Sequence, residues 1–410
     1  MKWIFGFLLF LLLPLLGESQ SNPLSRIVLE DDSLRKIAND PAHQVQIIYT
    51  RIDRDQQNKA HFTTYSYGLD STQYFYPAST VKMPVAALAL EKLNQLSIRG
   101  LDRGDRLLTG AATAPQTAVT ADSSASNGQP TMAHYIKKIF LVSDNDAYNR
   151  LYEFLGQRYL NERLHAKGYD RTRIIHRLSV SGYDTLGNRL TNPVSLYEAD
   201  QLLYHQGEVY SAFYPRLDLR NQVRGQGFID SQGELIAGVP FDFRYKNYAS
   251  LTDLHDMLLA ILFPQDIPKR ARFDLTEADY RFLYRYMYQY PREVDDPAYP
   301  HLANWDAYVK FLYFGSEKGR QTGPVRSLNK VGDAYGFLTD VAYIFDPKTG
   351  TEFVVAANIH VNANQIFNDG VYEYQEVGFP FMQRLGRLIY QYDAQRPRRR
   401  RADLSRFVPK

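Results

Sequence analysis

Apolar and alternating patterns mark two hairpins at opposite ends of the chain. Near the start, residues 43–51 (HQVQIIYTR) and 60–67 (AHFTTYSY) alternate between polar and apolar and are joined by a polar segment. Near the end, the apolar residues 337–345 (FLTDVAYIF) and 352–361 (EFVVAANIHV) flank the turn-forming sequence DPKTG. Strand-like runs that are bounded by turn residues predict β-hairpins.

Helical patterns occupy much of the chain between these hairpins. Residues 83–96 are apolar almost all round, which predicts a buried helix. Thr252 and Thr276 are expected to cap two further helices, and Pro291 stops the second of them. The remaining helices are predicted at residues 131–140, 146–155, 156–169 and 379–392.

Strands at both ends around a helical middle predict a mixed α/β (α+β) fold. Residues 194–206 fit either a helix or a pair of strands around Ala199, and we favour the strands. The α/β unit is expected from residues 40–95 and 325–390, and the helical unit from residues 96–178 and 250–324.

The composition is that of an ordinary globular enzyme, with 410 residues, 44% hydrophobic and 23% charged. The chain has no cysteine, which excludes thiol catalysis and disulfides. Its nine histidines are scattered without the spacing of metal ligands, so no metal or cofactor is expected. Nothing in the sequence indicates nucleic-acid binding.

The N-terminus has the pattern of a secretory signal peptide. Lys2 precedes an apolar run at residues 3–16, and Gly17-Glu18-Ser19 supplies a cleavage site. We therefore expect a signal peptide at residues 1–19 and export to the periplasm or the medium. An uncleaved membrane anchor is the alternative, although the run is short for a membrane span.

A basic tail covers residues 395–410 and contains Arg396 and Arg398 to Arg401. The formal net charge of the whole chain is only +3, so much of the positive excess lies in this tail. Such a tail is usually a solvated, disordered end. Contact with an anionic envelope surface is the alternative interpretation.

Ser79 and Lys82 form a Ser-x-x-Lys pattern in the stretch YPASTVK. Ser79 is placed where the buried helix begins, and Lys82 follows on the same face, near enough to take the hydroxyl proton. The pattern is weak by itself, because Ser33 and Lys36 match it without a comparable context. A capping serine beside a solvated lysine is the alternative.

Two further short patterns strengthen the first. Ser143-Asp144-Asn145 lies between two predicted helices, where it also fits an ordinary helix cap. Lys330-Val331-Gly332 opens a predicted strand, and a lysine in a loop before a turn is the alternative. The order of the three patterns along the chain is more specific than any one of them.

The three patterns together resemble the penicillin-recognising serine hydrolases, and most closely the class A β-lactamase branch. Gly336 and Asp340 extend the likeness, which covers about residues 40–170 and 250–390. The resemblance implies an antiparallel sheet flanked by helices beside an all-helical domain, with the site between them. It places one hydrolase domain at residues 25–390 with an enlarged insertion at residues 179–249.

The resemblance also implies roles for individual residues. Ser79 resembles the acylated nucleophile, Lys82 its base, and Ser143 the relay that carries the proton to the leaving nitrogen. Asn145 resembles a partner of the substrate amide, and Lys330 the cation that attracts an anionic substrate. The resemblance also implies that Gly332 and Asp333 bind the substrate. The backbone N–H groups of Ser79 and Asp333 are expected to form the oxyanion hole.

A second Lys-x-Gly pattern, Lys348-Thr349-Gly350, matches the third family motif more literally. It falls in the DPKTG turn between two predicted strands, where these residues favour a hairpin turn. Lys330 precedes the first of those strands, as the family requires, and is therefore the preferred residue.

In the class A pattern, a loop glutamate activates the water that frees the acyl-enzyme, and this chain departs from that pattern. The expected glutamate falls on Leu178 or Ser179, and Glu198, Glu208 and Glu234 in the insertion are conceivable substitutes. Val331 removes a hydroxyl donor for a substrate carboxylate, and Asp333 adds a negative charge that would repel one.

The sequence therefore predicts an exported serine hydrolase that acylates Ser79, with β-lactam hydrolysis that could be slow. A D,D-peptidase acting on cell-wall peptides is the first alternative, and a non-hydrolytic β-lactam-binding sensor is the second. The expected partner is a small β-lactam or cell-wall peptide, and we expect a monomer.

Overall fold

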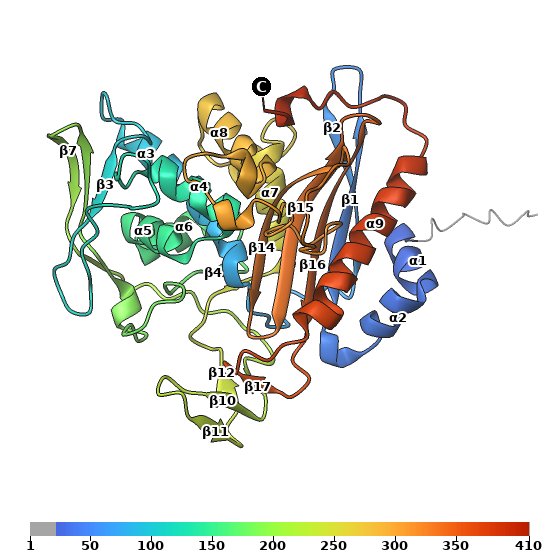
Figure 1. The fold of residues 1–410 in the computed structure, drawn as a ribbon, viewed down its shortest axis with the longest axis horizontal. Coiled ribbons are helices and arrows are strands. Elements are labelled where there is room, and N and C mark those ends of the chain that lie inside the picture. The colour runs from blue at the N-terminus through green and yellow to red at the C-terminus, as the bar shows by residue number, and fades with distance from the viewer. Residues whose placement is uncertain (1–21, 410) are drawn as a thin grey trace, which may run out of the picture.

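A five-stranded antiparallel sheet forms the centre of the fold (Figure 1). The computed structural model describes residues 22–409, so the predicted signal peptide at residues 1–19 lies outside the described part. The strand order β14-β15-β16-β1-β2 joins the two predicted hairpins through β1 and β16. These strands are β1 (Gln46–Arg54), β2 (Ala60–Tyr67), β14 (Arg326–Ala334), β15 (Phe337–Asp346) and β16 (Thr351–His360). The predicted mixed fold with an antiparallel sheet is confirmed.

Helices cover both faces of this sheet. They are α1 (Pro23–Glu30), α2 (Asp32–Ala38) and α9 (Phe379–Gln395) on one face, and α7 (Leu251–Leu262) and α8 (Glu277–Tyr288) on the other (Figure 1). Both faces of β15 are therefore buried, and its side chains alternate between two cores. Leu338 lies in the core under α9, and Val341 lies in the core under α7.

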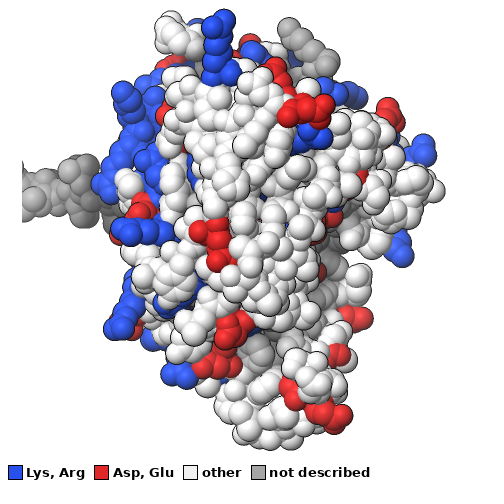
Figure 2. Space-filling model, turned by 90° about the vertical axis from the view of Figure 1, so that its left-hand side faces the viewer, with Lys and Arg blue, Asp and Glu red and all other residues white. Residues whose placement is uncertain are grey.

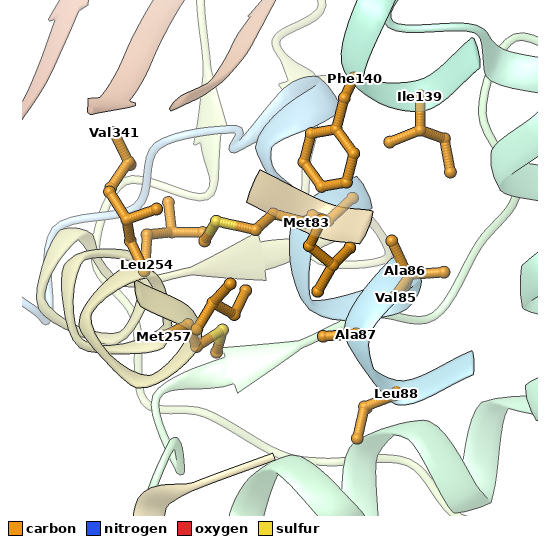
Figure 3. Close-up of a cluster of buried hydrophobic side chains, with 14 of the residues drawn as sticks. Met83, Val85, Ala86, Ala87, Leu88, Ile139, Phe140, Leu254, Met257 and Val341 are labelled. Carbon is orange, nitrogen blue, oxygen red and sulfur yellow. The ribbon is translucent and has the colours of Figure 1, made fainter. Parts of the chain in front are cut away.

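The helical unit is organised around α3, which is buried along most of its length. α3 packs against the other helices of the unit and against α7, and its residues Met83 and Ala87 lie near Phe140, Leu254 and Met257 (Figure 3). The helices of the unit are α3 (Lys82–Leu96), α4 (Met132–Val142), α5 (Asn145–Leu155) and α6 (Gln157–Ala166). Packing on all sides fixes the N-terminal end of α3 between the sheet and the helices.

Short strands replace long elements in residues 179–249. β6 (Val194–Glu198) and β7 (Gln201–Gln206) pair with each other, and β6 also pairs with β3 (Arg106–Thr109), which confirms the strand interpretation of this stretch. The other strands are β4 (Thr172–Arg173), β5 (Leu190–Thr191), β8 (Val209–Tyr210), β9 (Val223–Arg224), β10 (Gly227–Ile229), β11 (Leu235–Ala237), β12 (Phe241–Asp242), β13 (Tyr248–Ala249) and β17 (Ile366–Phe367).

β10, β11, β12 and β17 lie in a lobe at the lower end of the molecule (Figure 1). In Figure 2 the visible surface of this lower end consists mainly of uncharged residues with a few acidic ones. The segment that the resemblance marks as an insertion thus adds a surface of its own to the fold.

Two local predictions are wrong. Lys330 lies in the middle of β14, an additional edge strand, and not ahead of the first strand of the sheet. Ser250, and not Thr252, caps α7, because its side chain accepts a hydrogen bond from the backbone N–H of Asp253 at 3.0 Å. The expected cap of α8 is confirmed, since Thr276 and Asp279 form a capping box.

The basic tail is folded onto the protein, so the expectation of a disordered end is wrong. Arg396 and Arg398 form ion pairs with Asp393, which is buried, and Arg396 also pairs with Asp53. Phe407 is only 3% exposed and packs in the core under α8. Contact with an anionic envelope surface stays a prediction. In the chain between residues 22 and 409, no helix combines the length and apolarity that a membrane span needs.

Candidate active site

Ser79 lies in a tight turn at the junction of the sheet and the helical unit. The turn is a 3₁₀-helix at Ala78–Val81 that leads directly into α3. Ala78 has φ of 45°, in the left-handed region that residues with a Cβ seldom adopt. Such backbone strain persists only where the surroundings impose it and often accompanies a functional site. The half-buried Ser79 side chain reaches the wall of a cavity.

Lys82 is completely buried, and its Nζ atom lies beside the Ser79 hydroxyl. The distance from Nζ to Ser79 Oγ is 2.8 Å, and Nζ also lies 3.2 Å from Ser143 Oγ and 2.6 Å from Asn145 Oδ1. Nζ donates a further hydrogen bond to the backbone carbonyl of Ser143. All these partners are uncharged. Burial, with the nearby charge of Lys330, holds the pKa of Lys82 well below its usual value, which favours the neutral amine.

Ser143 connects the two lysines of the site. It ends α4 with φ of 58°, and Asp144 then caps α5 by accepting a hydrogen bond from the N–H of Ala147 at 2.8 Å. This sharp turn directs the Ser143 hydroxyl toward the sheet, where Lys330 Nζ donates to it at 2.9 Å. The capping interpretation of the motif thus holds for Asp144, while Ser143 and Asn145 face the site.

Lys330 reaches the site from the edge strand β14. Its Nζ atom donates to Ser143 Oγ and, at 2.8 Å, to the carbonyl of Val331. Burial lowers the pKa of Lys330 to about 7, against the opposing attraction of Asp333 and Asp340. Lys348, by contrast, lies in the turn between β15 and β16 and has no place in this cluster.

Gly332 brings β14 against the turn that carries Ser79. A Cβ atom at Gly332 would lie 2.7 Å from the backbone nitrogen of Ser79 and 2.6 Å from the carbonyl oxygen of Pro77. Both distances are shorter than real Cβ contacts, so this approach requires glycine. The expected oxyanion donors, the N–H groups of Ser79 and Asp333, therefore belong to two backbone segments that pass close to each other.

A cavity of about 760 Å³ opens beside Ser79. Its walls come largely from the segment after α6, with Asn145 and the loop residues Leu178 and Ser179 near the nucleophile. Asn145 Nδ2 donates to Ser179 Oγ at 2.9 Å, so the position expected for the missing glutamate does lie at this site. The size is in the range of ordinary ligand sites.

Asp184 and Asp333 supply the carboxylates among the described residues that line the cavity. Glu198, Glu208 and Glu234 do not belong to its lining. Glu208 instead accepts hydrogen bonds from Gln116 and Thr113. Enclosure by the protein raises the pKa of Asp333, although its side chain stays open to the cavity, and Lys330 and Lys82 oppose this rise.

Sequence reasoning missed the wall that faces these residues. His176 stacks parallel to Tyr76 with ring centres 6.0 Å apart, and burial lowers its pKa to about 3, so the ring is neutral. Arg177 forms a buried bidentate ion pair with Glu153, at 2.6 and 3.0 Å, which anchors the loop.

Six tyrosines line the cavity, namely Tyr76, Tyr183, Tyr214, Tyr245, Tyr335 and Tyr372. The abundance of tyrosine in the sequence was the signal for this aromatic lining, but it did not show which tyrosines would line the cavity.

Comparison with protein-family models matches residues 31–213 to the β-lactamase enzyme family. Among solved structures, the chain is similar to a β-lactamase from Sphaerobacter thermophilus at 12% identity and a TM-score of 0.47, with 92% of this chain and 98% of that chain covered. It is also similar to PBP-A at 16% identity and a TM-score of 0.48, with 91% and 96% covered. A comparison with the curated proteins found no match.

The family match contains Ser79, Lys82 and Ser143 and ends within the insertion. The fold described above, an antiparallel sheet between helical layers with a helical unit beside it, extends over the rest of the chain. Residues 31–213 of the chain are therefore similar to the β-lactamase enzyme family.

Proposed function

We propose that the protein is an exported serine hydrolase of the class A β-lactamase type that acylates Ser79 with amide or ester carbonyls, β-lactams included. The observation that carries this proposal is the contact of 2.8 Å between Ser79 Oγ and Lys82 Nζ, within a buried cluster that favours a neutral amine. A neutral lysine within hydrogen-bond distance of a serine is the arrangement that a base-activated nucleophile needs. The family match to a β-lactamase model supports the same reaction class.

In this mechanism Lys82 takes the Ser79 proton as Oγ attacks the carbonyl carbon. The oxygen of the tetrahedral intermediate accepts hydrogen bonds from the N–H groups of Ser79 and Asp333. Ser143, whose Oγ lies 3.2 Å from Lys82 Nζ and 2.9 Å from Lys330 Nζ, then delivers a proton to the leaving nitrogen. The carbon–nitrogen bond breaks, and the acyl group stays on Ser79.

In the proposed mechanism, release of the acyl group from Ser79 is the slow step. Leu178 and Ser179 stand at the cavity wall where a class A enzyme would hold its glutamate, and neither can accept a proton from water at neutral pH. Losing a general base typically slows a reaction by a factor of about 10² to 10⁴. Turnover of β-lactams is therefore expected to be limited by deacylation.

A D,D-peptidase acting on cell-wall peptides is the second candidate. The observation that favours it is the cavity of about 760 Å³, which residues 175–188 extend well beyond the nucleophile. A groove of this size accommodates a peptide, and a peptidase of this family needs no loop glutamate. Release of D-alanine from a peptide that ends in D-alanyl-D-alanine separates this activity from β-lactam hydrolysis.

The decisive experiment is covalent labelling by a fluorescent penicillin. Wild-type protein should gain the mass of one probe per chain, and Ser79→Ala should gain none, because the acylated oxygen is removed. Ser33→Ala, which alters the other Ser-x-x-Lys pattern, is the matched control and should label like wild type. Equal labelling of wild type and Ser79→Ala would refute the proposal.

A further inference from the structure

The carboxylate of Asp333 lines the same cavity as the nucleophile and has no hydrogen-bond partner among the described residues. Asp333 follows Gly332, whose contact with the Ser79 turn fixes its place, and its side chain is exposed in the cavity that Ser79 lines. Lys330 and Lys82 attract its carboxylate from a distance, but no hydrogen bond from the residues between 22 and 409 holds it. A carboxylate with free acceptor oxygens is thus available to a ligand.

The groups that could bind a substrate carboxylate are engaged elsewhere. Lys330 donates to Ser143 Oγ and to the carbonyl of Val331. The Val331 side chain is 2% exposed, carries no hydroxyl and packs in the core under α9. Arg177 lines the cavity but is held by Glu153 in a buried ion pair. An anionic substrate would therefore meet Asp333, while Lys330, the cation of the site, already donates to Ser143 and Val331.

The walls of the cavity suit a cation instead. Six tyrosines line the cavity, and the faces of aromatic rings attract positive charge. Two of these rings already have an arginine of the protein beside them, Arg177 at 3.9 Å from the ring centre of Tyr183 and Arg189 at 5.3 Å from that of Tyr214. A further opposing feature is Lys246, which also lines the cavity and whose Nζ atom lies 5.8 and 5.9 Å from the ring centres of Phe241 and Tyr335. Lys246 thus already lies against the ring of Tyr335, so a test of the inference needs a Lys246 variant as a control.

We propose that Asp333 makes this site select acyl donors that carry an ammonium or guanidinium group on the leaving side, where penicillin-type substrates carry a carboxylate. The inference rests on the proposed function of Ser79 as the acylated nucleophile. Asp333 is a specificity-determining residue in this account and takes no part in the proton transfers.

Three thioesters of phenylacetylglycine test the inference. Their leaving thiols are thiocholine, its uncharged isostere 3,3-dimethylbutanethiol, and 3-mercaptopropionate, which carry a positive charge, no charge and a negative charge. In each case Ser79 Oγ bonds to the carbonyl carbon, the carbon–sulfur bond breaks, and the proton from Ser79 ends on the thiol. A thiol-reactive dye reports release without background from the protein, which contains no cysteine.

The expected order of kcat/KM at about pH 8 is thiocholine above the isostere above the carboxylate. The ratio between the two charged thioesters should be at least about tenfold, and Asp333→Asn should lower it by about tenfold while the isostere changes little. Added salt should also lower the ratio in wild type, because it screens the charge of Asp333. A purely structural role of Asp333 would not predict this salt dependence. Asp184→Asn removes another cavity carboxylate and should leave the ratio unchanged.

Two results would overturn the inference. One is a wild-type preference for the carboxylate or for neither charge; the other is a ratio that Asp333→Asn does not change. A larger change in Lys246→Gln than in Asp333→Asn would assign the selectivity to Lys246 instead. If Ser79→Ala released every thiol as fast as wild type, the proposed function itself would be wrong, and the inference would fall with it.

Discussion

A lysine that is buried without a carboxylate partner is uncommon, because removing its charge from water is costly. Lys82 avoids this cost as a neutral amine, and the same neutrality makes it a base for Ser79. Lys330 is also buried, with a pKa lowered to about 7, so its charge is present only in part of the physiological range. The two lysines therefore act in opposite protonation states.

This division of roles predicts a bell-shaped pH profile for acylation by an uncharged ester. The rate should rise as Lys82 loses its proton and fall above about pH 7 as Lys330 loses the proton with which it supports Ser143. Lys330→Arg keeps the positive charge at high pH, so it should abolish the descending limb. The check is kcat/KM for Ser79 acylation from pH 5 to 10; a descending limb that stays near pH 7 in Lys330→Arg would contradict the assignment.

At the scale of elements, the contact of β14 with the Ser79 turn assembles the site. Because a Cβ atom at Gly332 would lie 2.7 Å from Ser79 N, Gly332→Ala should push the strand and the turn apart. A displacement of this kind commonly slows a reaction by about 10²-fold. We expect the acylation rate to fall by about that factor while the fold persists.

Gly323→Ala is the matched control for this variant. Nothing lies within 4 Å of a Cβ atom at Gly323, so its acylation rate should equal that of wild type. Stopped-flow labelling with a fluorescent penicillin measures both variants, and far-ultraviolet circular dichroism checks their folding. Wild-type rates in Gly332→Ala would show that the close approach of β14 is not needed.

The loop at Leu178 and Ser179 leads to a second prediction at this scale. Without a carboxylate in their place, acylation by a chromogenic cephalosporin should outrun deacylation. The expected trace is a burst of about one product per chain, followed by a slow steady state, with the acyl-enzyme visible by intact mass. Glu198→Gln, Glu208→Gln and Glu234→Gln should leave the steady state unchanged, because these side chains do not line the cavity. Linear turnover without a burst would require another base.

The elements that the sequence predicts are those whose local pattern agrees with their environment. The two hairpins and the cap of α8 belong to this group. The part of β14 before Lys330 was missed because its buried positions include Ser327 and Asn329, residue types that are typical of loops. A distant side chain pairs with polar groups of both residues, since Lys310 Nζ donates to the backbone carbonyl of Ser327 at 2.9 Å and to Asn329 Oδ1 at 2.8 Å. A tertiary network of this kind leaves no periodic signal.

In the candidate site, too, some residues could be predicted from the sequence and others could not. The motif residues Ser79, Lys82, Ser143, Asn145 and Lys330 were named from the sequence, and the structure brings them together. Their catalytic roles stay predictions. The tyrosine wall could not be foreseen, because it depends on the path of residues 179–249, which contain only strands of two to six residues. Such a path is determined by tertiary contacts and not by local propensity.

At the scale of the whole molecule, the C-terminal tail joins the two sides of the sheet. It leaves α9 on one face, runs over the end of the sheet, and reaches α8 on the other face (Figure 1). There the ring of Phe407 packs 4.9 Å from that of Tyr343 and 5.3 Å from that of Tyr284, measured between ring centres. The tail therefore contributes to the stability of the fold, and its arginines are in part structural.

Phe407→Ala should accordingly destabilise the protein, although it lies only three residues from the end of the chain. Phe407 is 3% exposed, and truncating a buried phenylalanine to alanine typically costs about 3–5 kcal/mol. Urea unfolding followed by tyrosine fluorescence should show a lower midpoint with an unchanged slope. Arg400→Ala alters an exposed side chain of the same tail and should leave the midpoint where it is. Equal midpoints for Phe407→Ala and wild type would mean that the tail does not hold the two sides of the sheet together.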